Sequence, residues 1–161
     1  MRCFCAAKPD DPRAIGAKKH LQAKEQTVRA FLQKAFPNYI WTFNSEWRRS
    51  GAFEGRLRER PDARTMIADR AIIVEVDEHS HASYDCAKER FREGIFVATA
   101  ASEGKIIVLL RLNPDGYTDE HGVYFPTCFK LSKKSGQVTV DPKQQKQWDG
   151  RLAELGERVR F

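Results

Sequence analysis

The chain has 161 residues, a length that fits one domain with a single sizeable core. Its hydrophobic fraction is 41%, and no apolar run approaches the roughly 18 residues that a transmembrane helix needs, so we expect a soluble protein without a membrane segment. Lys and Arg outnumber Asp and Glu by 28 to 22, and the resulting net charge of +6 fits a polyanionic partner without requiring one.

The N-terminal sequence and the cysteines bear on the location of the protein. No secretion signal is visible, so we expect an intracellular protein in a reducing compartment, the cytoplasm or the nucleus. Four cysteines do not indicate a disulfide framework in a chain of this length without such a signal. Cys3 and Cys5 have the spacing of half a zinc site, but no second close pair completes four ligands, and we expect ordinary reduced thiols.

The first predicted element is a helix from Ala14 to Phe36. Its apolar stripe at helical spacing consists of Leu21, Val28, Leu32 and Ala35. Glu25 falls on the same stripe, and a carboxylate on an apolar face needs an inward partner. Two interpretations stay open: an ion pair with an arginine at the edge of the core, or a contact with the acidic cluster described below, directly or through water.

Aromatic and basic residues follow this helix. Tyr39–Asn44 has the β-branched and aromatic content of a first strand, and the predicted surface loop after it contains Trp47, Arg48 and Arg49. An exposed tryptophan beside two arginines could contact nucleic acid, because the ring stacks or wedges while the guanidiniums meet phosphates. The alternative is that Trp47 covers one end of the sheet. The next predicted strand carries a row of positive charge on one face, formed by Arg56, Arg58, Arg60 and Arg64.

A cluster of acids lies at the centre of the sequence. Ala71–Val76 is apolar and rich in β-branched residues, which predicts a strand covered on both faces. A hairpin centred between positions 68 and 69 places Asp62 opposite Glu75, with Cβ atoms about 4.5–5.5 Å apart, and alternation puts Asp77 on the same face. Three crowded carboxylates repel one another and form an oxygen cage for a hard divalent cation. Asp62, Glu75 and Asp77 are therefore the predicted metal site.

A second helix and a buried strand follow the acids. The predicted helix spans Ser83–Ala101, with Tyr84, Phe91, Ile95 and Ala98 on its apolar side. Lys105–Leu112 is a buried strand, and the strand, helix, strand order implies a parallel, right-handed crossover.

The C-terminal part is predicted to be peripheral. Val123–Phe125 opens a hairpin that returns through Gln137–Val140, and a closing helix begins at the Asp141 cap. The buried side of that helix consists of Trp148, Leu152, Leu155 and Val159. We expect one α/β domain with a central mixed sheet flanked by helices, a core over about residues 14–117, and a peripheral hairpin and helix over 118–161.

The order helix, strand, hairpin of strands, helix, strand, with acids on the two central strands, resembles the restriction-endonuclease-like superfamily. The core of that superfamily is αβββαβ and its signature is PD-(D/E)XK. Here the match is Pro61-Asp62, twelve residues, and then Glu75-Val-Asp77, with Asp77 where lysine is usual. The chain is similar to the branch of very short patch repair endonucleases and EDxHD homing endonucleases, in which a histidine follows six residues after the second acid, as His81 follows Glu75. The resemblance covers roughly residues 18–117.

The resemblance implies a metal-dependent DNA endonuclease. Asp62, Glu75 and Asp77, with Glu25 as a further candidate, would hold Mg²⁺, with Mn²⁺ as a possible substitute, and His81 would deprotonate the attacking water. His79 is the competing histidine, but it has the other strand parity and is expected at the surface. Arg90 would reach the scissile phosphate. Duplex DNA would contact Trp47, Arg48, Arg49, Arg60, Arg64 and Arg90.

Two other functions stay open. One is a nucleic-acid-binding domain with lost or weak catalysis, for which the missing lysine is the best argument. The other is a hydrolase of RNA or of sugar phosphates that uses the same site. Neither the oligomeric state nor any sequence specificity follows from the residues.

Overall fold

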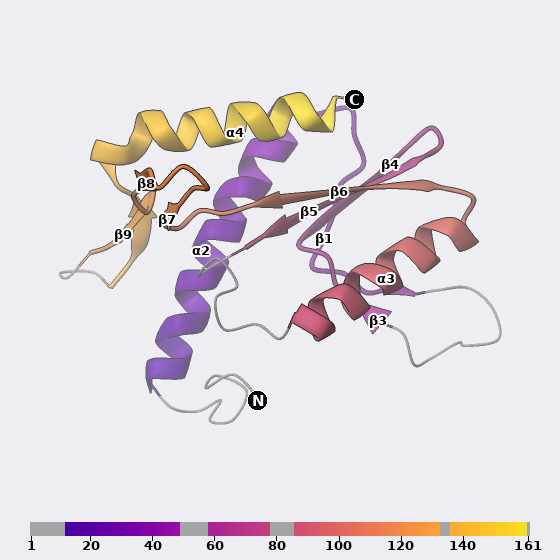
Figure 1. The fold of residues 1–161 in the computed structure, drawn as a ribbon, viewed down its shortest axis with the longest axis horizontal. Coiled ribbons are helices and arrows are strands. Elements are labelled where there is room, and N and C mark those ends of the chain that lie inside the picture. Colours follow the sequence, from indigo (N-terminus) through magenta and orange to yellow (C-terminus); the bar gives the residue numbers. More distant parts are fainter. Residues whose placement is uncertain (1–11, 49–57, 78–85, 133–135, 161) are drawn as a thin grey trace.

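The computed structural model describes residues 12–48, 58–77, 86–132 and 136–160, and for residues 12–22, 48, 58 and 86 it describes the backbone alone. Its main sheet has four strands in the order β1 (Thr42–Phe43), β4 (Ala63–Ile67), β5 (Arg70–Val76) and β6 (Ile106–Leu112). The first three strands are antiparallel neighbours, and β6 is parallel to β5. The protein is therefore α/β with a mixed sheet, as predicted (Figure 1).

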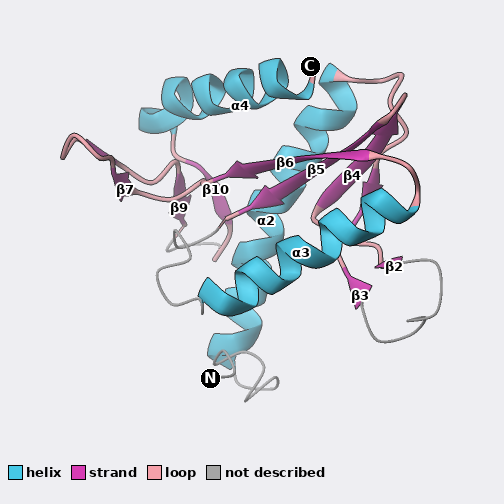
Figure 2. Ribbon diagram, turned by 45° about the vertical axis from the view of Figure 1, so that its right-hand side comes forward, coloured by secondary structure: helices cyan, strands magenta, loops and turns pink. Residues whose placement is uncertain are grey.

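Three long helices cover this sheet. They are α2 (Pro12–Ala35), α3 (Cys86–Ser102), which makes the predicted parallel crossover from β5 to β6, and α4 (Gln145–Val159). Helices α2 and α4 pack on one face of the sheet and α3 packs on the other (Figure 2). Three predicted elements agree with the structure within a residue or two. The predicted helix Ala14–Phe36 corresponds to α2, and the predicted strands Ala71–Val76 and Lys105–Leu112 correspond to β5 and β6.

Strand β5 is buried on both faces because its side chains alternate between two cores. Ile72, Val74 and Val76 join the larger core with Val28 and Leu32 of α2, and α4 adds its own apolar stripe to that core. On the other face, β5 meets α3 through a smaller core made of Trp47, Ala71, Ile73, Phe96 and Ala100. By this alternation Glu75 faces the α3 side.

The hairpin of β4 and β5 has the predicted register. Ala63 pairs with Val74 and Ile67 pairs with Arg70, so the hairpin is centred between Ala68 and Asp69. Ala68 itself has a positive φ of 50°. Asp62 and Glu75 therefore come to the same end of the hairpin, at the end away from the turn.

The predicted arginine-bearing strand is broken into two. Arg58–Glu59 forms β3, which pairs with β2 (Trp47–Arg48), whereas β4 begins only at Ala63. Pro61 lies between them, and proline has no N–H group for a strand ladder. Arg58, Arg60 and Arg64 therefore do not form one row on one strand, which corrects the prediction, and Arg56 lies outside the described residues.

The C-terminal part contains two hairpins where one was predicted. Strand β8 (Tyr124–Phe125) pairs with β7 (Tyr117–Thr118), and β10 (Val138–Val140) pairs with β9 (Phe129–Leu131). Asp141 caps a short 3₁₀ helix, η2 (Pro142–Gln144), by accepting a hydrogen bond from the Lys143 N–H at 3.1 Å. The predicted buried side of α4 is confirmed for Trp148, Leu152, Leu155 and Val159. Within the described residues, no helix has the length and apolar character needed to cross a membrane.

Candidate active site

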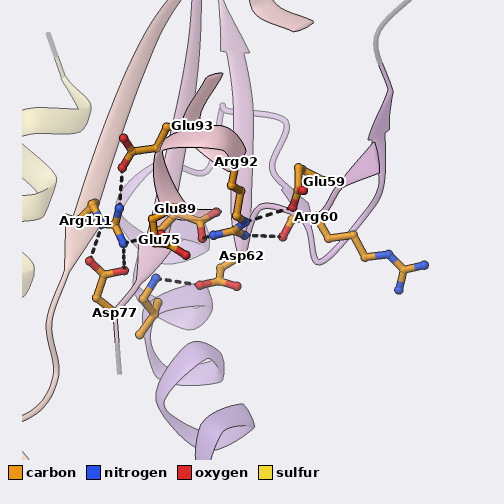
Figure 3. Close-up of polar contacts among 10 residues, drawn as sticks. Glu59, Arg60, Asp62, Glu75, Asp77, Glu89, Arg92, Glu93 and Arg111 are labelled. Atoms are coloured by element: carbon orange, nitrogen blue, oxygen red, sulfur yellow. Dashed lines mark hydrogen bonds and ion pairs between the residues drawn. The ribbon is translucent and has the colours of Figure 1, made fainter. Parts of the chain in front are cut away.

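Two of the predicted carboxylates meet at the open end of the β4–β5 hairpin. Asp62 directly precedes β4, and its Oδ2 atom accepts a hydrogen bond of 2.7 Å from the Val76 N–H. Glu75 lies in β5 with only 4% of its surface exposed. The charge of Asp62 contributes to the raised pKa of Glu75, and Figure 3 shows the two side chains next to each other. The predicted juxtaposition of Asp62 and Glu75 is therefore present.

The charge of this acid pair is incompletely compensated. Glu75 Oε2 accepts a hydrogen bond of 2.5 Å from Arg92 Nη1, whereas the buried Oε1 has no hydrogen-bond partner among the described residues. Burial, with the charge of Asp62, raises the pKa of Glu75 to about 7, although Arg92 and the backbone N–H of Asp62 oppose the change. Burial likewise raises the pKa of Asp62 to about 6, although the Val76 hydrogen bond opposes the change. Desolvation and a like charge are the two effects that disfavour an ionised carboxylate.

Glu25 approaches the same pair from helix α2. Its Oε2 atom accepts a hydrogen bond of 3.0 Å from Asn44 Nδ2, and its charge contributes to the raised pKa of Asp62. A polar cavity of ≈ 220 Å³ lies beside Glu25, and it is lined by Glu25, Gln26, Arg29, Phe43, Asn44 and Asp62. Of the two interpretations of Glu25, a place beside the acidic cluster agrees with the effect of its charge on Asp62.

Asp77 is not part of the acid pair. Its two carboxylate oxygens accept hydrogen bonds of 2.5 and 3.0 Å from Nε and Nη2 of Arg111 on β6 (Figure 3). Arg111 also binds Glu93 at 2.6 Å and Glu89 at 3.1 Å, so these four side chains join β5, β6 and α3. Within the described residues, no three His, Cys, Asp or Glu side chains form a group that could hold a metal ion. This finding corrects the predicted cage of three carboxylates.

Asp62 and Glu75 nevertheless fit a hard divalent cation. Mg²⁺ is commonly bound by one or two carboxylates and completes its octahedron with water and substrate phosphate, so a third carboxylate is not needed. The buried, unpartnered Oε1 of Glu75 is the kind of atom that such a cation would satisfy. The raised pKa values of both acids have the same cause, negative charge in a poorly solvated place.

Arg92 is a site residue that the sequence analysis missed. Besides Glu75, its guanidinium binds Glu59 Oε2 at 3.1 Å and the carbonyl oxygen of Arg60 at 3.2 Å. The predicted phosphate-contacting residue, Arg90, is instead exposed on the outer side of α3. The apolar side predicted for this helix was wrong, because it included Phe91, which is 64% exposed. The buried side of α3 consists of Ile95, Phe96, Thr99 and Ala100. Arg92 lies one turn before Phe96 on that buried side, and this spacing was the available signal.

Trp47 is not an exposed nucleic-acid contact. It is 3% exposed in β2, stacks on Phe96 of α3, and its Nε1 donates a hydrogen bond of 2.7 Å to Glu103. The guanidinium of Arg64 lies over the Trp47 ring at 4.9 Å, and Arg64 Nε is itself buried. The burial of Trp47 corrects its predicted exposure and agrees with the alternative that it covers one end of the sheet, whereas Arg64 is half-buried beside it.

The other predicted contacts divide into exposed and undescribed residues. Arg60 has a side chain that is 65% exposed and pairs with Glu46 at 2.8 Å. The side chain of Arg48, and the whole of Arg49, His79 and His81, lie outside the described residues. Arg60 and Arg90 are thus the predicted contacts with exposed side chains among the described residues.

No model of a known protein family matches the chain, and a comparison with curated proteins likewise finds no match.

Proposed function

We propose that the protein is a metal-dependent DNA endonuclease that hydrolyses phosphodiester bonds, with Asp62 and Glu75 in its active site. One observation carries the proposal: two carboxylates with raised pKa values meet at a sheet end, and a buried oxygen of one of them has no partner among the described residues. Perturbed carboxylates beside a cavity are typical of functional sites. If Arg92 and Glu75 formed only a structural ion pair, we would expect both oxygens of Glu75 to have partners and the charges of the two acids to be balanced.

The arrangement of elements supports a restriction-endonuclease-like assignment. Helix α2 is followed by the strands β1, β4 and β5 of the main sheet, then by α3 and the parallel strand β6, an order compatible with the αβββαβ core if the separate hairpin β2–β3 is counted as an insertion. Asp62 directly precedes the second of these core strands and Glu75 lies on the third, as the proposed PD-(D/E)XK assignment requires of its two acids. Fold alone does not establish activity, so the proposal rests on the acid pair.

Each acidic side chain has a distinct role in the proposed site. Asp62, oriented by the Val76 N–H, and Glu75 would hold Mg²⁺ or Mn²⁺ directly, and Glu25 would contact the ion's water from the cavity. When bound, the ion polarises a phosphoryl oxygen and stabilises charge on the leaving oxygen. The role of Asp77 is to anchor Arg111, and so to fix the end of β5 against β6 and α3.

His81 is the proposed general base. It would accept a proton from the water whose oxygen bonds to phosphorus, while the bond from phosphorus to a sugar oxygen breaks and that oxygen takes a proton from solvent. An imidazole is suited to this task because its ordinary pKa lies near neutral pH. The assignment rests on the spacing of six residues from Glu75.

The charge of the chain supports DNA as the substrate. The net charge of +6 favours a polyanion, and the side chains of Arg60 and Arg90 are exposed. Arg60 immediately precedes Pro61-Asp62 in the chain, and Arg90 lies on the helix that carries Arg92.

A supercoiled plasmid assay tests the proposal. Wild-type protein is incubated with Mg²⁺, with Mn²⁺ and with EDTA, beside the variants Asp62→Asn, Glu75→Gln and His81→Ala. The matched control is Glu154→Gln, since Glu154 is 65% exposed on α4 and far along the chain from the site. We expect nicking or cutting by the wild type and the control with either cation, and a loss of about 100-fold or more in each site variant.

The outcomes separate the open functions. Duplex DNA that is bound in a gel-shift assay but never cut under any divalent cation would support the binding domain, which the pairing of Asp77 with Arg111 at the usual lysine position favours. Faster cleavage of RNA than of DNA of the same sequence would move the proposal to an RNA hydrolase. Equal cleavage by Glu75→Gln and wild type would remove the acid pair from the mechanism.

A further inference from the structure

We propose, on the basis of the proposed function, that Arg92 is a catalytic residue: it pairs with Glu75 before a divalent cation binds, and then turns Nη1 to an oxygen of the substrate phosphate. Among the described residues, Arg92 is the only basic side chain that an ion pair joins to either Asp62 or Glu75. It comes from α3, so it approaches the acid pair from the side opposite Glu25 and α2.

The guanidinium is held in place independently of Glu75. Nε binds Glu59 at 3.1 Å and Nη2 binds the carbonyl oxygen of Arg60 at 3.2 Å, while the guanidinium carbon lies 5.1 Å from the centre of the Phe96 ring. Figure 3 shows these two anchors on the side of the guanidinium that faces away from Asp77 and Arg111. Loss of the Glu75 contact would therefore free Nη1 without releasing the side chain.

A bound cation gives Glu75 a reason to exchange its partner. Glu75 has two oxygens, of which one is unpartnered and the other is held by Nη1 at 2.5 Å. A divalent ion attracts a carboxylate more strongly than a singly charged guanidinium at the same distance does. If Glu75 turned both of its oxygens to such an ion, Nη1 would lose its acceptor, and an unpaired charged donor in a partly buried place is costly. An oxygen of the substrate phosphate would satisfy Nη1, because guanidinium and phosphate have complementary geometry.

The charges at the site agree with this role. Asp62, Glu75 and a divalent ion would together carry no net charge, so Arg92, whose charge Glu59 offsets in part, would supply the positive charge that faces a phosphodiester. As the phosphorus becomes five-coordinate a second negative charge develops on its oxygens, and a fixed donor aimed at that place lowers the barrier. Arg111 cannot take the role, because its guanidinium is engaged by three carboxylates, Asp77, Glu89 and Glu93.

The experiment compares Arg92→Gln and Arg92→Lys with wild type, with Arg158→Gln as the control. Arg158 is 66% exposed on α4, so its variant makes the same change in net charge outside the site. Two quantities are measured at pH 8.5: the dissociation constant for Mn²⁺, by calorimetry without DNA, and the single-turnover cleavage rate with saturating Mn²⁺ and duplex. Thermal melting of each variant confirms that it is folded at the assay temperature.

A catalytic arginine predicts changes of opposite sign in the two quantities. Arg92→Gln should bind Mn²⁺ about ten-fold more tightly, since a repelling charge is removed, and should cleave about 100-fold or more slowly, since the phosphate loses a donor. Arg92→Lys keeps the charge, so its Mn²⁺ affinity should stay near that of wild type, while its compact ammonium, which lacks the planar guanidinium geometry, restores only part of the rate. The control should change neither quantity.

Several results would overturn the proposal. A purely structural Arg92 predicts that Arg92→Gln binds Mn²⁺ equally or more weakly. If that variant is not folded, Arg92→Lys decides, and a full wild-type rate in Arg92→Lys would remove the need for a guanidinium. If wild type and Arg92→Gln cleave equally well, only the role of Arg92 is refuted. A wild type that neither binds Mn²⁺ nor cleaves defeats the proposed function together with it.

Discussion

Glu75 and Asp62 carry negative charge in a place that the fold alone does not stabilise. Their pKa values of about 7 and about 6 lie above the ordinary values of 4.5 and 3.8. At a pH between the ordinary and the raised pKa of each acid, the folded protein therefore keeps a proton that the unfolded chain has lost. The stability that comes from the protonated carboxyls is complete below the ordinary values and is lost as the pH rises through 6 to 7.

We therefore predict that the cation-free protein becomes less stable between pH 5 and pH 8. The free energy of unfolding in EDTA, measured with urea, should fall by roughly 2–4 kcal/mol from this pair, a value reduced from the full shifts because Asp62 is partly exposed. Glu75→Gln cannot ionise, so its curve should be flatter. Mg²⁺ should stabilise wild type more at pH 8 than at pH 5. Parallel pH curves for wild type and Glu75→Gln would contradict the prediction.

At the residue scale, the juxtaposition of Asp62 and Glu75 could be predicted from the sequence, but the arginines that pair with the acids could not. The pairing of Asp62 with Glu75 followed from counting across the turn, because an antiparallel hairpin allows no other partner once its centre is known. The partners of the acids come from distant segments: Arg92 from α3 and Arg111 from β6. Which cation a carboxylate meets depends on how those elements pack, and a single sequence contains no signal for this beyond the buried spacing of Arg92 with Phe96.

At the scale of the element, the turn of the β4–β5 hairpin is the strained position. Ala68 has a φ of 50°, a left-handed conformation that costs an L-residue about 1–2 kcal/mol. Glycine adopts it freely but loses more entropy on folding, so the two effects partly cancel. We predict that Ala68→Gly raises the free energy of unfolding by about 0.5–1 kcal/mol, and the melting temperature by roughly 1–4 °C.

A matched variant gives this prediction its control. Ala153 is exposed in the middle of α4, so Ala153→Gly removes the same methyl group from a right-handed helix and should destabilise the protein by about 1 kcal/mol. The two variants should thus change the melting temperature in opposite directions. If Ala68→Gly also lowers it, the turn is not strained. Neither variant should alter cleavage, since the acids lie at the other end of the hairpin.

The elements that could be predicted are those with a periodic pattern long enough to recognise. Helices α2 and α4 and strands β5 and β6 have such patterns, and their predicted bounds agree with the structure within a few residues. The strands of two or three residues have none. For that reason Trp47 was placed on a loop, and Val123–Phe125 was paired with Gln137–Val140 when its partner is β7. Tertiary packing decides such short pairings.

At the scale of the whole molecule, the two sides of the sheet are held by different forces. On the side of α2 and α4, a large apolar core joins both helices to β5 through Val28, Leu32, Trp148 and Leu155. On the α3 side, the apolar core is small and ion pairs complete the contact at the end where Asp77 lies. Apolar burial is the stronger and less screened of these forces.

We predict that α3 opens locally before α2 and α4 do when Arg111 is removed. Arg111→Gln leaves Asp77, Glu89 and Glu93 facing one another without the guanidinium between them. Because the Arg111 side chain is 31% exposed, the loss of stability should be about 1–2 kcal/mol, less than for a fully buried pair. Hydrogen exchange measures it: amide protection should fall more in α3 than in α2 and α4, whereas Arg158→Gln should change neither. An equal fall in all three helices would show that the sheet and both of its faces open as one unit. A separate opening of α3 would also move Arg92, and so connect the stability of this face to the activity of the proposed site.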